Sequence, residues 1–452
     1  MPEPRPEIRA AREPLTLTEF KRALEQGLGR AILCLQKHDP APYRNIILEA
    51  CLKDTRFDSQ CEDSRVPYLL EAMELVGNIE FFEERILQAH PKTPTTTPDF
   101  HEHRWLEQQF SAFALAFAKR GNATARQLLY DSFAMNPCYS DKFALERNDL
   151  IIELDGLEGL RFVLEQYARV ARDDLEYWLD SGMLGDAVER LGAKVVQELI
   201  EELSRANADI KSIVERGKLL PIPGFRRSPT KYTPRPLAYA VFVQRVQRRS
   251  PFPGGIVSWS RFATKAALKQ VARDLLEQTE PELIRGHLYA FRIRPFPLSA
   301  RHLLKLARHE NAEVREGALV AMQAIKHPAI RALALELKHD PTMRIEAVAM
   351  LESNYELGDA AIVLETIHSL SDAEFIHWFG YRVRDIYRKN RVPEALEPLL
   401  ALYESNPCSS CRESFVMLMQ EIGVLPNWVL EEAAWDSAED TRTQARAWAI
   451  AA

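Results

Sequence analysis

Glycine is scarce in this chain, at 18 of 452 residues, or about 4% against a usual ~7%. Because glycine destabilises helix interiors, its shortage among plentiful Ala, Leu, Glu and Arg favours helices over sheets. Long apolar runs are missing as well: no stretch approaches 18 consecutive apolar residues, which excludes a transmembrane helix by length. The sequence therefore predicts an all-α chain with no membrane partner.

Neither a signal peptide nor a disulfide framework is indicated. The chain begins MPEPRPEIRAAREPL, with proline and charge where a signal peptide needs an apolar run. Cysteines are few and irregularly spaced, which favours reduced thiols in a cytosol. They are Cys34, Cys51, Cys61, Cys138, Cys408 and Cys411. We therefore expect a cytoplasmic protein whose residues 1–15 form a disordered lead-in.

Acidic residues are absent from one stretch of 58 residues, 216–273, which carries thirteen Lys and Arg. The chain has a net charge of −7, so everything outside this stretch sums to −20 (−7 minus 13). Its first part, 219–236, holds five prolines and must be a loop or an extended arm. Helices are expected at 237–249 and at about 258–278. Such positive charge in an acidic protein indicates an anionic partner.

The second of these expected helices would carry Arg261, Lys265 and Lys269 at positions i, i+4 and i+8, as a continuous basic stripe. The block before the basic stretch, 146–215, is acidic, with seventeen Asp and Glu against eight Lys and Arg. The two blocks could dock on each other, and this stays open beside the binding of a separate partner.

From Leu298 the sequence repeats itself. Residues 311–319, NAEVREGAL, align with 340–348, DPTMRIEAV, at an offset of 29 residues. A third copy, CSSCRESFV, begins at Cys408, and a fourth contains Thr441 and Arg442. Each copy has an upstream helix, a short polar turn and a second helix that opens with an apolar residue and Arg. Such a unit buries its apolar faces only by stacking on its neighbours.

This pattern resembles HEAT repeats, particularly the short bacterial HEAT-like kind, over about 298–452 and more weakly at 39–44 and 122–126. The resemblance implies a curved α-solenoid of helix pairs, and most HEAT-like proteins are scaffolds or adaptors. It also implies that the recurrent arginines link neighbouring units through acidic turn residues. These arginines are Arg315, Arg344, Arg412 and Arg442.

We therefore expect an all-α, curved α-solenoid of HEAT-like helix pairs with a Pro-rich basic insertion. Its regions would be the lead-in at 1–15, an N-terminal helical repeat region at 16–215, the basic insertion with its helices at 216–297, and C-terminal HEAT-like repeats at 298–452.

Metal and nucleophile motifs are missing. No P-loop, GxGxxG, HExxH or GxSxG occurs. A structural zinc site needs four ligands, and Cys408-x-x-Cys411 has no second close Cys/His pair, so no metal or other cofactor is expected. Because this pair falls at an expected helix start, a lowered thiol pKa is conceivable. The sequence therefore gives no catalytic residue.

Two HEAT-like enzyme families were compared on their site residues. Deoxyhypusine hydroxylase uses four His-Glu pairs in matching repeat positions to bind iron, whereas here two occur in non-equivalent positions, at 101–103 and at His309-Glu310. HEAT-like DNA glycosylases need a carboxylate beside an aromatic platform. Trp378 and Asp385 could be proposed for that role, but Trp378 also fits a buried helix face.

The function expected from the sequence is a non-enzymatic scaffold that binds a macromolecular partner through its basic segment, with no small-molecule ligand. The partner could be a protein or a nucleic acid, because Lys and Arg neutralise phosphates and the aromatic residues between them can stack on bases. A HEAT-like enzyme, hydroxylase or glycosylase, ranks third. The expected binding residues are Arg226, Arg227, Lys231, Arg235, Arg245, Arg248, Arg249, Arg261, Lys265 and Lys269.

Overall fold

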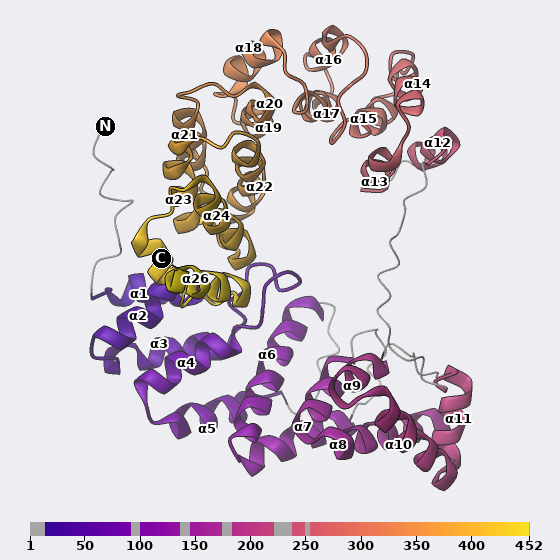
Figure 1. Ribbon diagram of the computed structural model, residues 1–452, viewed down its shortest axis with the longest axis vertical. Coiled ribbons are helices and arrows are strands. Elements are labelled where there is room, and N and C mark those ends of the chain that lie inside the picture. Colours follow the sequence, from indigo (N-terminus) through magenta and orange to yellow (C-terminus); the bar gives the residue numbers. More distant parts are fainter. Residues whose placement is uncertain are drawn as a thin grey trace. The chain divides into compact units, whose positions relative to one another are not determined.

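We analysed a computed structural model of the chain, which describes residues 14–91, 100–135, 145–173, 183–220, 237–248 and 254–451. The described residues are mostly helical (Figure 1) and contain no β-strand, only an isolated bridge between Leu237 and Ala263. This confirms the all-α prediction. In this part of the chain, every helix is too short or too polar to cross a membrane.

The chain forms two compact units, each described here by itself. The N-terminal unit comprises Glu13–Ser59 and Asp63–Thr230. Of the described residues, the C-terminal unit comprises Gln60–Glu62, 237–248 and 254–451. The segment 60–62 therefore packs with residues that lie far from it in sequence.

Helices of the N-terminal unit contact their neighbours in sequence. The largest described core in this unit lies among α7 to α11, where side chains such as Leu160, Leu164 and Ile200 are fully buried. The unit is built from α1 (Leu17–Gln26), α2 (Gly29–Lys37), η2 (Ala41–Tyr43), α3 (Arg44–Cys51), α4 (Val66–Val76), α5 (Ile79–Ala89), α6 (Phe100–Lys119), α7 (Ala123–Met135), α8 (Leu145–Asp173), α9 (Met183–Leu191), α10 (Ala193–Ala206) and α11 (Ala208–Gly217).

Helices of the C-terminal unit also pack mainly on helices close to them in sequence, for example α15 on α17, α22 on α24 and α24 on α26. They are α12 (Tyr239–Gln247), α13 (Gly254–Phe262), α14 (Lys265–Leu275), α15 (Pro281–Tyr289), α16 (Ala300–Leu306), α17 (Ala312–Met322), α18 (Pro328–Leu337), α19 (Arg344–Ala349), α20 (Leu351–Asn354), α21 (Ala360–Ser369), α22 (Ala373–Lys389), η3 (Pro393–Ala395), α23 (Leu396–Ser405), α24 (Ser409–Ile422), α25 (Asn427–Ala433) and α26 (Glu439–Ala451).

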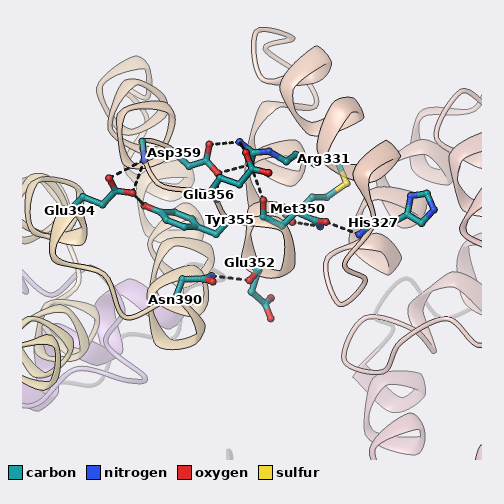
Figure 2. A network of polar contacts seen from close by, with 11 residues as sticks. His327, Arg331, Met350, Glu352, Tyr355, Glu356, Asp359, Asn390 and Glu394 are labelled. Atoms are coloured by element: carbon teal, nitrogen blue, oxygen red, sulfur yellow. Dashed lines mark hydrogen bonds and ion pairs between the residues drawn. The ribbon is translucent and has the colours of Figure 1, made fainter.

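Two asparagines join successive helix pairs of the C-terminal unit at their ends. Asn354 donates from Nδ2 to the carbonyl of Ile325 at 2.9 Å, and its Oδ1 accepts from the His327 amide at 2.8 Å. Asn390 donates from Nδ2 to the carbonyl of Glu352 at 2.9 Å (Figure 2). Asn390 thus satisfies one of the last carbonyls of α20, which lack a partner within that helix, and Asn354 satisfies main-chain groups of the loop between α17 and α18.

The strongest of these connections is an ion pair between α18 and the start of α21. Arg331 holds the carboxylate of Asp359 with two hydrogen bonds of 2.6 and 2.9 Å, and it also donates to the carbonyl of Asn354 at 2.8 Å. Asp359 is almost completely buried, and its carboxylate also accepts from the amide of Glu356 at 2.7 Å (Figure 2). Bidentate arginine–carboxylate pairs of this kind fix geometry as well as charge.

The recurrent arginines differ in how they link units. Arg412 is fully buried and pairs with the Asp436 carboxylate of the following turn at 3.4 Å, as the repeat pattern predicts. Arg315 instead donates to the carbonyls of His309 and Glu310, at 2.9 and 2.8 Å, in the turn that precedes its own helix. The arginine at this repeat position therefore has two roles: at Arg412 it links two units, and at Arg315 it bonds to the carbonyls of the preceding turn.

Replacing Arg331 with Leu should lower the free energy of unfolding by roughly 3–5 kcal/mol, because the buried Asp359 carboxylate would lose its charged partner. The matched control is Arg308→Leu, which breaks the pair with Glu336 at the same spacing of 28 residues. Both side chains of that pair are exposed, at 59% and 58%, so the expected loss is about 0–1 kcal/mol. Urea unfolding followed by circular dichroism measures both; equal losses would contradict the argument.

Candidate functional site

The structure describes half of the predicted binding residues. Arg226, Arg227, Lys231, Arg235 and Arg249 lie outside the described residues. The other five are spread over three helices: Arg245 lies in α12 and Arg248 caps it, Arg261 lies in α13, and Lys265 and Lys269 lie in α14. Helix α12 contacts both α13 and α14, so these residues belong to one cluster of helices.

The predicted helix at 258–278 is wrong. Thr264 has an extended backbone, and its hydroxyl accepts a hydrogen bond from the amide of Ala267 at 3.1 Å, as an N-cap does. Helix α13 therefore ends at Phe262 and α14 begins at Lys265. Arg261 lies on a different helix from Lys265 and Lys269, and the predicted continuous stripe does not form.

One predicted binding residue, Arg245, is engaged within the unit. Its side chain is half-buried and donates to the carbonyl of Gly255, which ties α12 to the start of α13. This contact gives Arg245 a structural role.

The other four described cations, Arg248, Arg261, Lys265 and Lys269, are exposed. Within the ranges that the structure describes, none of their side chains has an ion pair or a hydrogen bond; the main-chain carbonyl of Arg261 accepts from the Arg294 side chain at 3.3 Å. Arginines elsewhere often pair with carboxylates, for example Arg126 with Asp155 and Arg382 with Glu346. We call these four residues the basic face; it is a surface of uncompensated positive charge.

Three aromatic side chains in the described part of the basic stretch pack into the unit. Phe242 and Trp259 are fully buried, and the indole nitrogen of Trp259 donates to the carbonyl of Ala238 at 3.1 Å. The hydroxyl of Tyr239 donates to Asp274; burial and this hydrogen bond raise the pKa of Tyr239 to about 12. These three rings are therefore not available for stacking on bases.

A second group of reactive side chains lies between α22 and α24. His377, Cys408 and Cys411 are all buried, and their ligand atoms lie within 4.8 Å of one another. The closest measured approach is 3.6 Å, between Cys411 Sγ and His377 Nδ1. Two thiols and an imidazole are ligands that zinc and iron prefer. We call these three residues the thiol–imidazole cluster.

Hydrogen bonding around the cluster shifts its thiols in opposite directions. The hydrogen bond from Cys408 to Cys411 raises the pKa of the Cys408 thiol, and burial raises it further. The same hydrogen bond lowers the pKa of Cys411, helped by the Tyr381 hydroxyl and by the positive charge of Arg384. Cys411 is therefore the thiol of the pair that ionises first.

Buried Asn406 connects the two segments that carry the cluster. Its Oδ1 accepts from the amide of Cys408 at 3.1 Å, and its Nδ2 donates to the carbonyl of Ile376, beside His377, at 3.4 Å. Gly380, one turn after His377, lets α22 approach closely: a Cβ there would lie 2.8 Å from Asn406 Nδ2. These contacts fix the imidazole against the thiols.

The segment 60–62 lies on the N-terminal end of α24. The buried carboxylate of Glu62 accepts from the amide and the hydroxyl of Ser409 at 2.9 and 2.6 Å, and the carbonyl of Cys61 accepts from the Ser410 hydroxyl at 2.9 Å. The Cys61 thiol also acts electrostatically on the Tyr381 hydroxyl, as Cys408 and Cys411 do. A third cysteine thus lies beside the cluster.

We did not predict this cluster from the sequence, because we considered only ligand pairs that are close in sequence. His377 precedes Cys408 by 31 residues (408 minus 377), about one repeat of 29. A residue one repeat away lies on the neighbouring unit, so that offset was the signal that could have found His377. Cys61 carries no such signal.

Residues considered for enzyme chemistry are not assembled into a site. Trp378 is 56% exposed, so the expectation of a buried position is wrong, and its indole nitrogen donates to Glu374 at 3.2 Å. Asp385 pairs with Arg384 at 3.2 Å. His309 is a turn residue, as predicted, and accepts from the amide of Asn311 at 3.0 Å. The side chains of residues 101–103 lie outside the described ones.

No protein-family model matches the chain, and no curated protein or solved structure shows significant similarity to it.

Gly380→Ala should destabilise the C-terminal unit, because the added methyl group would meet Asn406 at 2.8 Å and the Phe415 ring at 3.0 Å. Overpacking costs about 1–3 kcal/mol, and the better helix preference of alanine offsets only about 0.5–1 kcal/mol. Gly254→Ala is the control, since a Cβ there meets nothing within 4 Å. Thermal unfolding should show a lower midpoint for Gly380→Ala alone; a stabilised Gly380→Ala would contradict the close approach of α22.

Proposed function

We propose that the protein is a non-enzymatic, cytoplasmic scaffold that binds an acidic surface of a protein partner through the basic face. In this proposal the helix pairs form a HEAT-like α-solenoid that carries the basic face at α12 to α14. The observation that carries the proposal is the exposure of Arg248, Arg261, Lys265 and Lys269 without compensating carboxylates in the described residues.

The solenoid part of the proposal rests on neighbour-to-neighbour packing in the C-terminal unit. Contacts there run mainly between helices that are one or two steps apart in sequence, such as α17 with α19 and α21 with α23. The ion pair of Arg331 with Asp359 and the amides of Asn354 and Asn390 all span between 28 and 38 residues. Links of about one repeat are what a stacked array of helix pairs requires.

A separate partner is favoured over docking within the chain because several carboxylates of the acidic block already pair with cations of their own unit. Within the block, the carboxylates of Glu153 and Asp155 pair with Lys119, Arg190 and Arg126. Glu202 and Asp209 likewise pair with Arg161 and Arg172. Carboxylates that already have cations gain less from the basic face than unpaired acidic groups on another molecule would.

An acidic protein is favoured over nucleic acid because of where the aromatic rings lie. Proteins that bind single strands stack bases on exposed aromatic side chains beside their cations. Phe242 and Trp259 are instead part of the core. Exposed Lys and Arg without exposed rings bind through charge alone. An acidic protein surface offers the negative charge for such binding, and so do the phosphates of a nucleic-acid duplex.

Reversing Lys265 and Lys269 to Glu should weaken binding of an acidic probe by roughly tenfold or more, because it replaces attraction with repulsion on one helix face. The probe is a fluorescently labelled poly-glutamate peptide, followed by anisotropy at two salt concentrations. Wild-type affinity should fall as salt rises, since exposed charges are screened. The matched control is Lys194→Glu with Lys211→Glu, two exposed lysines of the acidic block, which should leave binding unchanged.

Labelled duplex DNA, duplex RNA and single strands are measured in parallel. Tighter binding of any nucleic acid than of the peptide at ~150 mM salt, lost in Lys265→Glu with Lys269→Glu, would replace the protein partner with a nucleic acid. Absence of binding to every probe at low salt would contradict the proposal, as would equal effects of the two double variants.

A further inference from the structure

We propose that His377, Cys408 and Cys411 bind a zinc ion, and that the thiol of Cys61 is its fourth ligand. The site goes beyond the scaffold function and lies on other helices than the basic face. It joins three pieces of the C-terminal unit: α22, the start of α24, and the segment 60–62.

The spacing of the ligand atoms fits tetrahedral zinc. With zinc–sulfur bonds of about 2.3 Å and a zinc–nitrogen bond of about 2.0–2.1 Å, a bound thiolate and a bound imidazole nitrogen lie about 3.6 Å apart. Cys411 Sγ and His377 Nδ1 are 3.6 Å apart. Cys408 Sγ lies within 4.8 Å of both atoms. A small adjustment of the Cys408 side chain therefore completes three corners of the tetrahedron.

The surroundings hold these ligands in place before any metal binds. Asn406 fixes the main chain at Cys408 and at Ile376, next to His377, through two hydrogen bonds. Gly380 allows the close packing of α22 on the segment that carries the thiols. Hydrogen-bonded residues around a metal site orient its ligands in this way, and their loss weakens metal binding.

Cys61 is assigned as the fourth ligand because two side chains hold its segment on the start of α24. Ser409 and Ser410, the two residues between the cysteines of the pair, bond to Glu62 and to the Cys61 carbonyl. The Cys61 side chain is exposed, and in the proposed site it turns so that its thiol reaches the zinc ion. Glu62 and Ser409 are 347 positions apart in sequence, and their hydrogen bond places Cys61 next to the two buried thiols, where it can serve as a ligand.

Zinc binding by three thiols and one imidazole is a ligand exchange that releases protons. Each cysteine loses one proton and binds as thiolate, so the three thiols release three protons and the ion replaces them. The site uses four protein ligands and no water, which is the arrangement of structural zinc sites. Its effect is to fasten the segment 60–62 to α22 and α24.

The test is metal analysis of the full-length protein, purified under reducing conditions after growth with added zinc. Mass spectrometry of the metals should find one zinc per chain. Replacement of zinc by cobalt should give the visible bands of a tetrahedral site, with thiolate-to-cobalt absorption that falls by about one third in Cys61→Ser. The wild-type measurement needs no variant and so does not depend on how a variant folds.

The variant Cys408→Ser with Cys411→Ser should lose the metal, whereas Cys34→Ala with Cys51→Ala should keep one zinc per chain. The control cysteines are equally buried but lie in the N-terminal unit. Chelation should lower the melting temperature of the wild type and leave that of Cys408→Ser with Cys411→Ser unchanged.

Three results would overturn the site: no metal in protein whose thiols are all reduced, iron in place of zinc at one per chain, or a disulfide between Cys408 and Cys411. An unchanged cobalt spectrum in Cys61→Ser would overturn the assignment of the fourth ligand.

Discussion

In the C-terminal unit, some polar groups at the ends of helix pairs find their partners in the next pair. Asn354 and Asn390 donate to main-chain carbonyls of preceding helix pairs, and Arg331 neutralises the buried Asp359. A buried carbonyl or carboxylate without a partner costs several times what an ordinary hydrogen bond contributes. The register between pairs is therefore fixed by polar groups, while the apolar faces supply most of the favourable free energy.

The repeat alignment and one contact between units were predictable from the sequence, whereas the contacts of Arg331, Asn354 and Asn390 were not. The recurrent Arg position was found by alignment, and at Arg412 it forms the expected link to an acidic turn residue. At Arg315 the same position donates to main-chain carbonyls of the turn that precedes its own helix. The helix break at Thr264 was missed because the apolar period continues across it; only the capping hydroxyl marks the start of α14.

The thiol–imidazole cluster was likewise not predictable, because its residues are far apart in sequence. Its three residues come from α22 and from the start of α24, and the proposed fourth ligand comes from the segment 60–62, so no sequence window contains them. We expected no metal because the sequence has no second Cys/His pair close to Cys408 and Cys411. His377 lies about one repeat length before Cys408 and can therefore reach it from the neighbouring helix pair. By contrast, the gathering of positive charge is visible in the sequence, which has no acidic residue at 216–273, although the predicted continuous stripe is broken at Thr264.

The basic face and the thiol–imidazole cluster lie in the same unit but are separated by several helix pairs. In a stacked array, each pair contacts its neighbours, so the effect of a local change weakens with each interface that it crosses. If the packing of α22 on α24 loosened, the resulting displacement would therefore affect α19 to α21 and α25 to α26 before it affected α12 to α14. Metal binding at the cluster would therefore change the affinity of a partner for the basic face only weakly. For this reason the proposed zinc site would act on the stability of the C-terminal unit, and the proposed binding would act at the basic face, each largely independent of the other.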